Sequence, residues 1–136
     1  MTSHETQYIN TDLELRSNAP LLALHRELEQ DCCILYYGAV DSKTWLLTAE
    51  ANTPEVAFTP NYRPENHIRE LLRVFSQLSK AAKMELRSCH TRMFDMGFSC
   101  GYSERDVYQL SPELIKAIAE ANCSVMVTLY SAATPY

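Results

Sequence analysis

Residues 92–98, RMFDMGF, alternate with a period of two residues. Because successive side chains of a β-strand point to opposite faces, Phe94, Met96 and Phe98 share one face, and Asp95 lies on the other. A face that carries two phenylalanines must be covered by other elements of the fold. The segment therefore predicts a core strand of a packed domain, with one carboxylate on its second face.

Four further segments have the composition of strands, and three have the spacing of helices. The strands are predicted at 12–17, 32–40, 44–51 and 124–131, with 93–100 as the fifth. The first helix starts at an Asn18 cap, with Pro20 in its first turn, and buries Leu21, Leu24 and Leu28. The second runs from Pro64 to Leu78, and the third starts at Ser111-Pro112 and stops at Asn122.

The resulting order, β-α-β-β-α-β-α-β, predicts an α+β fold. Its first six elements match a ferredoxin-like split β-α-β core, which a C-terminal α-β unit extends. We expect one mainly antiparallel sheet with the helices on one face and the other face open. Residues 1–136 form a single domain in this interpretation, with 1–11 as a loose tail and 52–63 as the longest irregular loop.

The charge balance excludes some classes of partner. The chain has a net charge of −5 and no stripe of lysine and arginine, so we expect no nucleic acid partner. No apolar run is long enough to cross a membrane. The polar start MTSHETQYINTD lacks the apolar segment of a secretory signal, so we expect none. Five cysteines, an odd number, indicate reduced thiols, so we expect a cytoplasmic protein.

Residues 89–100 contain the side chains of a cysteine enzyme, but their spacing does not favour one. Cys89 and His90 are adjacent on an extended chain, so their side chains diverge instead of forming a nucleophile–base pair. Pairing Cys89 or Cys100 with a distant His25 or His67 is not supported by any spacing, and both histidines sit on predicted helices as surface or boundary residues. No zinc-type spacing and no phosphate-binding loop occurs. We therefore expect no catalytic residues, no metal and no cofactor.

The residues that favour binding lie on the predicted sheet. We expect Asp95 to be a partly buried carboxylate that needs a partner, which Arg92 or Arg87 of the same segment, or an arginine from elsewhere, can supply. Glu50 can approach Asp95 across the sheet. Tyrosine and tryptophan are the usual anchors of protein interfaces. The remaining expected partner-binding residues are Tyr36, Tyr37, Trp45 and Tyr102.

Three motifs carry a resemblance to a known family. They are RMFDMGF at 92–98, SPELIKAIAEAN at 111–122 and VTLY at 127–130. The chain resembles a bacterial family of small uncharacterised domains with a strand R-x-F-D-I-G-F, a helix opened by S-P-E-L and a closing strand ending T-x-Y. Met96 stands where that pattern prefers isoleucine. The resemblance implies no enzyme activity and no catalytic residues, and it extends to candidate immunity proteins, which neutralise a protein toxin.

Three hypotheses about function follow. The first is a non-enzymatic interaction protein, of immunity type, that binds a basic or cleft-bearing protein through the open sheet face and the loops at 52–63 and 99–109. The second is a small enzyme or ligand-binding domain that uses Cys89, His90, Asp95 or Cys100. The third is a structural homodimer in which the edge strands of two sheets pair.

Overall fold

The computed structural model describes residues 6–52, 63–101 and 107–131, which form one five-stranded sheet with four helices. The strands are β1 (Gln7–Ser17), β2 (Cys32–Ala39), β3 (Trp45–Ala51), β4 (Thr91–Ser99) and β5 (Ser124–Tyr130). The helices are α1 (Leu22–Asp31), α2 (Pro64–Ser76), α3 (Lys80–Ser88) and α4 (Pro112–Glu120). None of these helices has the length and apolar composition that crossing a membrane requires.

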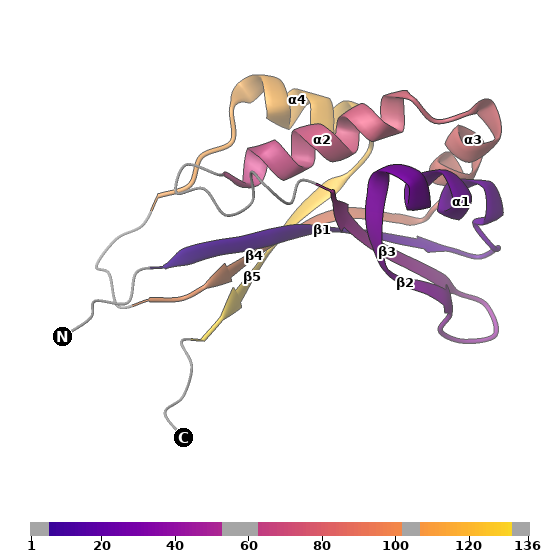
Figure 1. Cartoon of the computed structure of the whole chain (residues 1–136), viewed down its shortest axis with the longest axis horizontal. Helices are drawn as coiled ribbons and strands as arrows, with labels where there is room; N and C mark the ends of the chain where they lie inside the picture. The colour runs from indigo at the N-terminus through magenta and orange to yellow at the C-terminus, as the bar shows by residue number, and fades with distance from the viewer. Residues whose placement is uncertain (1–5, 53–62, 102–106, 132–136) are drawn as a thin grey trace.

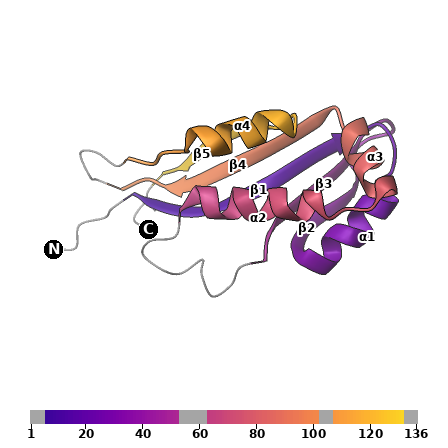
Figure 2. The ribbon, with the colours of Figure 1, turned by 90° about the horizontal axis from the view of Figure 1, so that it is seen from above.

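The sheet is mixed, and the helices cover one of its faces. The strand order is β2-β3-β1-β4-β5. The pairs β2–β3, β3–β1 and β1–β4 are antiparallel, and β4–β5 is parallel. All four helices lie on the same side of the sheet, with α2 above β1 and α4 above the β4–β5 side (Figures 1 and 2). The α+β class, the mainly antiparallel sheet and the single helical layer are therefore as the sequence predicts.

The core lies between the sheet and the helices, and strand alternation decides which residues enter it. On β4, Phe94, Met96 and Phe98 are buried, as the alternation of RMFDMGF predicts. The same face of the sheet contributes Leu13, Leu15, Leu47, Ala49 and Ala51, and the helices contribute mainly Leu24, Leu28, Ile68, Leu71, Leu114 and Ile118. These residues form a single buried cluster. Within the described residues, no helix lies over the opposite face of the sheet (Figures 1 and 2).

Helices α1 and α3 cap each other, which the sequence did not suggest. Glu85 of α3 accepts hydrogen bonds from the main-chain N–H groups of Ala23 and Leu24 at the start of α1. Glu27 of α1 accepts from the N–H and the hydroxyl of Ser79, at the start of α3. The predicted Asn18 cap is therefore wrong: the helix begins at Leu22, and carboxylates from a neighbouring helix satisfy its first amides.

Two further element boundaries, those of the second predicted helix and of the N-terminal segment, differ from the prediction, and those of α4 match it. The helix from Pro64 ends at Ser76, and α3, a helix that the sequence analysis missed, follows from a Ser79 cap. Residues 7–11 belong to β1 and pair with β4, so the prediction of a loose tail is wrong for them. Ser111 caps α4 through the N–H of Leu114, and Asn122 takes a left-handed conformation with φ 55° after it, both as predicted.

Candidate functional site

The uncovered face of the sheet carries polar side chains at its centre. On β1, the residues that alternate with the buried leucines are Asp12, Glu14 and Arg16. Glu50 of β3 and Asp95 of β4 project to the same side, because each is paired in register with Asp12. The two edges of this face bear exposed aromatic residues. We call this surface the open face.

Three carboxylates form a row across the central strands of the open face. Glu50 of β3 is the register partner of Asp12 on one side, and Asp95 of β4 is its partner on the other. Directly opposed residues of antiparallel strands have Cβ atoms about 5 Å apart, so like charges here oppose folding. We call Glu50, Asp12 and Asp95 the acidic row.

Two neutral side chains support the acidic row. The amide of Asn10 donates to Oδ1 of Asp12 at 2.8 Å and to Oε2 of Glu50 at 2.9 Å, and so bridges two of the carboxylates. The hydroxyl of Thr128, on β5, donates to Oδ1 of Asp95 at 2.6 Å. These bonds fix the orientation of the carboxylates without neutralising them, since both donors are uncharged.

Ionisation of the central carboxylate, that of Asp12, is disfavoured in the folded chain. The pKa of Asp12 is raised from 3.8 to about 6, first by partial burial and then by the negative charges of Glu50 and Asp95. The hydrogen bond from Asn10 acts in the opposite direction. Ionised Asp12 therefore costs the folded state stability, because its carboxylate is partly buried and faces the negative charges of Glu50 and Asp95.

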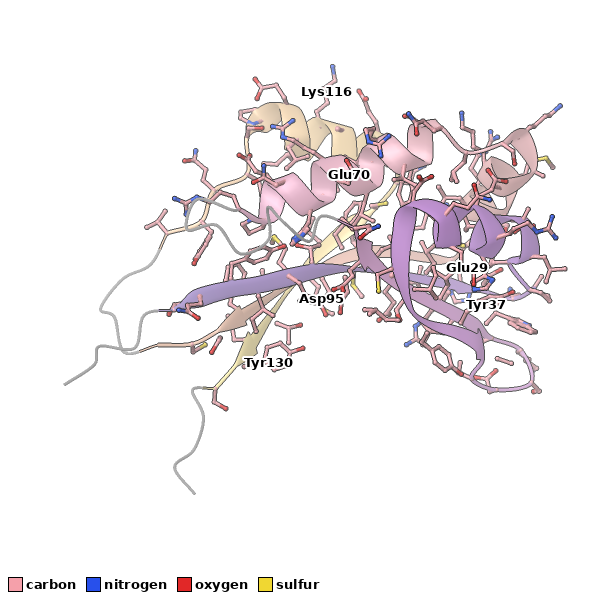
Figure 3. All side chains as sticks on the ribbon, in the orientation of Figure 1. Glu29, Tyr37, Glu70, Asp95, Lys116 and Tyr130 are labelled. Carbon is pink, nitrogen blue, oxygen red and sulfur yellow. The ribbon has the colours of Figure 1, made fainter. Side chains whose placement is uncertain are left out.

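Aromatic rings flank the row on the same face. Tyr130 is 54% exposed at the end of β5, and its ring carbon Cε2 would lie 3.4 Å from a Cβ placed on Gly97. Tyr36 on β2 is 46% exposed, and its ring lies over Gly38 in the same manner. Because glycine has no Cβ, a tyrosine side chain approaches the backbone closely at each of these positions, while it stays accessible to solvent. Figure 3 shows Asp95 and Tyr130 on the side of the sheet away from α2 and α4.

The structure brings together two of the predicted charged residues and separates the third. Glu50 and Asp95 both lie on the open face, with Asp12 between them. Arg92 is on the opposite face, because it is three residues from Asp95 on the same strand. It donates from Nη1 and Nε to the main-chain oxygens of Leu86, Arg87 and Asn122 at 3.0–3.1 Å. The predicted Arg92–Asp95 partnership is therefore wrong, and Arg92 instead binds the C-terminal ends of α3 and α4.

Two of the predicted aromatic residues have structural contacts. The Tyr37 hydroxyl accepts a hydrogen bond from the N–H of Leu21 at 2.8 Å, and its ring stacks on His25 with centroids 4.3 Å apart. Trp45 lies against Tyr37 with centroids 5.5 Å apart. Both therefore support α1 on the helical side of the sheet. Tyr36 is on the open face, and Tyr102 lies outside the described residues, as does most of the 52–63 loop.

The cysteines and histidines do not assemble a nucleophile and base within the described residues. Cys89 is buried and its Sγ donates to the main-chain oxygen of Glu85, while the neighbouring His90 is exposed. Burial raises the pKa of the Cys89 thiol to about 11, and burial does the same for Cys32 and Cys123. Thiols with such pKa values are poor nucleophiles at neutral pH. In the same part of the chain, no three His, Cys, Asp or Glu side chains are grouped so that they could hold a metal ion.

One polar cluster lies inside the core, and the sequence analysis did not anticipate it. His67 of α2 is only 4% exposed, where the sequence suggested a surface or boundary histidine. Its Nδ1 lies 2.5 Å from the Tyr8 hydroxyl, which in turn lies 2.5 Å from the Thr11 hydroxyl. Burial lowers the pKa of His67 to about 4, with a small opposing effect from the charge of Glu50. A neutral His67 therefore links α2 to β1 in the core, on the helical side of the sheet.

Asp12, the member of the acidic row that is not among the predicted binding residues, has a local signal in the sequence. Asp12 and Glu14 alternate with Leu13 and Leu15, so their common face with Arg16 could be read from 12–17. Only the register between strands places Asp12 between Glu50 and Asp95. That register depends on the pairing of strands that are far apart in the sequence. On β1 and β3, for example, Asp12 and Glu50 are about 40 residues apart.

Comparisons with known proteins found no match of any kind. No protein-family model matches the chain, and the searches of curated proteins and of solved structures gave no match. The resemblance to the bacterial family with the R-x-F-D-I-G-F strand therefore stays a prediction.

Proposed function

We propose that this chain is a non-enzymatic interaction protein that binds the basic surface of another protein through its open face. The observation that carries the proposal is the acidic row: Glu50, Asp12 and Asp95 lie side by side on the face of the sheet that no helix covers. Like charges in direct register destabilise the folded chain in isolation. A partner that places cations against the row relieves this repulsion on binding.

The flanks of the row have the properties of an interface. Tyr36 and Tyr130 present large, accessible rings on the same face, and tyrosine is a residue that commonly dominates interface energetics. Glu14 lies next to Asp12 on that face, with its carboxylate 3.1 Å from Nε of Arg16. A net charge of −5 attracts a basic protein over distance and speeds encounter, while the rings and the desolvated row determine how long the complex lasts.

The finer proposals concern the partner and the fold. The partner is a protein toxin with a basic cleft, so that the chain acts as an immunity-type inhibitor in the bacterial cytoplasm. The core β1-α1-β2-β3-α2-β4 is a ferredoxin-like split β-α-β arrangement. The strand order β2-β3-β1-β4 with antiparallel neighbours supports it, because β3 lies between β1 and β2, and β1 lies between β3 and β4.

The test begins with capture of a partner and ends with measured affinities. The wild-type chain is immobilised, proteins of the source organism that are retained at 0.1 M salt are identified by mass spectrometry, and each is purified and titrated back. The diagnostic variant combines Asp12→Asn, Glu50→Gln and Asp95→Asn, which remove the charges of the row and keep its shape. The control combines Glu29→Gln, Glu113→Gln and Glu120→Gln, exposed residues of α1 and α4 on the helical side.

Both variants change the net charge equally, so they separate the site from the overall charge. We expect the diagnostic variant to bind a basic partner about tenfold more weakly or worse, and the control to bind nearly as the wild type does. Equal losses in both variants would show that only net charge matters. Retention of no protein, or of proteins indifferent to both variants, would refute the proposal.

A further inference from the structure

The edge strand β5 is the least protected part of the sheet. Its sequence, SVMVTLY, contains no charged residue and no proline. Five of its seven side chains are exposed large hydrophobic residues, and these are Val125, Met126, Val127, Leu129 and Tyr130. Its pairing with β4 is regular from Ser124 to Tyr130. Edge strands usually avoid pairing with other chains through charges, prolines or bulges, and β5 has none of these.

The opposite edge of the sheet differs in one respect. β2 also lacks charges, but its register with β3 shifts between Ile34 and Tyr36. An irregularity of this kind twists the strand and interrupts the row of free backbone groups. Of the two edges, β5 is therefore the one that can accept another strand along its whole length.

The outward backbone groups of β5 are defined by its bonds to β4. The main-chain oxygen of Tyr130 accepts from the N–H of Cys100, so Tyr130 directs its backbone groups toward β4. Backbone groups alternate between the two sides of a strand, so those of Val125, Val127 and Leu129 point away from the sheet. Within the described residues, no hydrogen bond reaches these outward groups.

The side chains of the same three residues are also incompletely covered. They lie on the helical face, because they pair in register with Phe94, Met96 and Phe98. Val127 is 53% exposed and Leu129 is 65% exposed. On α4, above this side of the sheet, Ile115 is 54% exposed (Figure 2). An apolar strip therefore follows the free edge.

Antiparallel pairing of β5 with a second β5, about a two-fold axis at Val127, satisfies both the backbone and the side chains. Val127 then faces Val127, and Val125 faces Leu129 of the second copy. These are the hydrogen-bonded pairs of the new ladder, so all the outward groups of the three residues find partners. The intervening pair, Met126 with Thr128, is neutral. The strand is thus complementary to itself, and no like charges oppose each other.

The net charge of the chain does not prevent this association. In the paired sheet the two Asp95 side chains are separated by three strand spacings, or about 14 Å. That exceeds the Debye length of about 10 Å at 0.1 M salt, so their repulsion is largely screened. A two-fold axis perpendicular to the sheet also keeps both helical layers on one side, and it joins the two open faces into one surface.

We propose that the chain forms a homodimer by antiparallel pairing of β5 with β5, which gives a continuous ten-stranded sheet. The first test is the mass of the purified wild-type chain, measured by sedimentation equilibrium between micromolar and millimolar concentration. We expect twice the 15.5 kDa mass of one chain at the upper end. A single-chain mass at every concentration would overturn the proposal.

Two variants locate the interface on β5. Val127→Lys places two ammonium groups opposite each other at the axis and should weaken the dimer about tenfold or more. Val127→Pro removes one outward N–H and leaves the bonds to β4 intact. The control is Leu35→Lys, at a 47% exposed residue of the β2 edge, which should dimerise as the wild type does. Circular dichroism confirms that each variant is folded.

Hydrogen exchange followed by NMR gives the residue-level test. The amides of Val125, Val127 and Leu129 should be protected only at concentrations where the dimer forms. Those of Met126 and Thr128, which point toward β4, should be protected at every concentration and serve as the internal reference. A dimer in which the three outward amides still exchange at monomer rates, or which Val127→Lys leaves unchanged, would show that another surface is used, and the proposal would be wrong.

Discussion

Replacing Asp12 by asparagine should make the isolated protein more stable at neutral and alkaline pH. The substitution removes the central charge of the acidic row and keeps the side-chain shape. It also keeps Oδ1, the atom that accepts the hydrogen bond from Asn10. The repulsion from Glu50 and Asp95 and the cost of burying a carboxylate both disappear.

The magnitude follows from the pKa of Asp12. A rise from 3.8 to about 6 corresponds to about 3 kcal/mol at about 1.4 kcal/mol per unit. Because the carboxylate is only partly buried, solvent screening reduces this to about 1–2 kcal/mol. A raised folded-state pKa gives stability that is complete below about pH 4 and is lost as the pH rises through about 6. The gain from Asp12→Asn should therefore be present at pH 8 and close to zero below pH 4.

Urea unfolding of wild type and variant at pH 8 and pH 3.5 measures both values. Glu29→Gln is the control, because it removes one exposed carboxylate of α1 and should change the free energy of unfolding by less than about 0.5 kcal/mol. A destabilising effect of Asp12→Asn at pH 8 would refute the reasoning. So would a gain of the same size at both pH values, since that gain would not come from ionisation.

Three other predictions concern the remaining polar groups. The imidazole of His67, with a pKa of about 4, should stay neutral in NMR titrations down to pH 5, and its burial should remove stability as the pH falls from about 6.5 toward 4. Arg92→Lys should lower the free energy of unfolding by about 1–3 kcal/mol, because lysine cannot reach the three carbonyl oxygens that Arg92 binds; an unchanged urea midpoint would contradict this. With a thiol reagent at pH 7.5, exposed Cys33 should react well before Cys89, and rapid labelling of Cys89 would instead favour the enzyme hypothesis.

The elements that the sequence revealed are those with strong local signals. The alternation of 92–98, the Ser111-Pro112 start and the Asn122 stop depend on neighbouring residues, and the structure confirms each of them. Helix α3, which is absent from the prediction, also has a local signal: Ser79 is a good helix cap and precedes KAAKMELRS, a run of good helix formers. The start of α1 had none, because its cap, Glu85, is more than 60 residues away in the sequence.

The open face was predicted in outline, but its centre was not. The strand patterns predict Glu50 and Asp95, whereas the partner they leave open for Asp95 is an arginine, Arg92 or Arg87 of the same segment or one from elsewhere. Alternation alone places Arg92 on the face of Phe94, which excludes Arg92 as a partner of Asp95. The position of Asp12 between the other two acids could not be read locally, because it depends on how β1 pairs with β3 and with β4.

The central claim is that the acidic row is kept for binding at the expense of stability. The most direct measurement is an isothermal titration of the captured basic partner into wild type, Asp12→Asn and Glu29→Gln at pH 8. We expect Asp12→Asn, the more stable protein, to bind severalfold more weakly than wild type, and Glu29→Gln to match wild type. Equal affinities for all three proteins would contradict the claim.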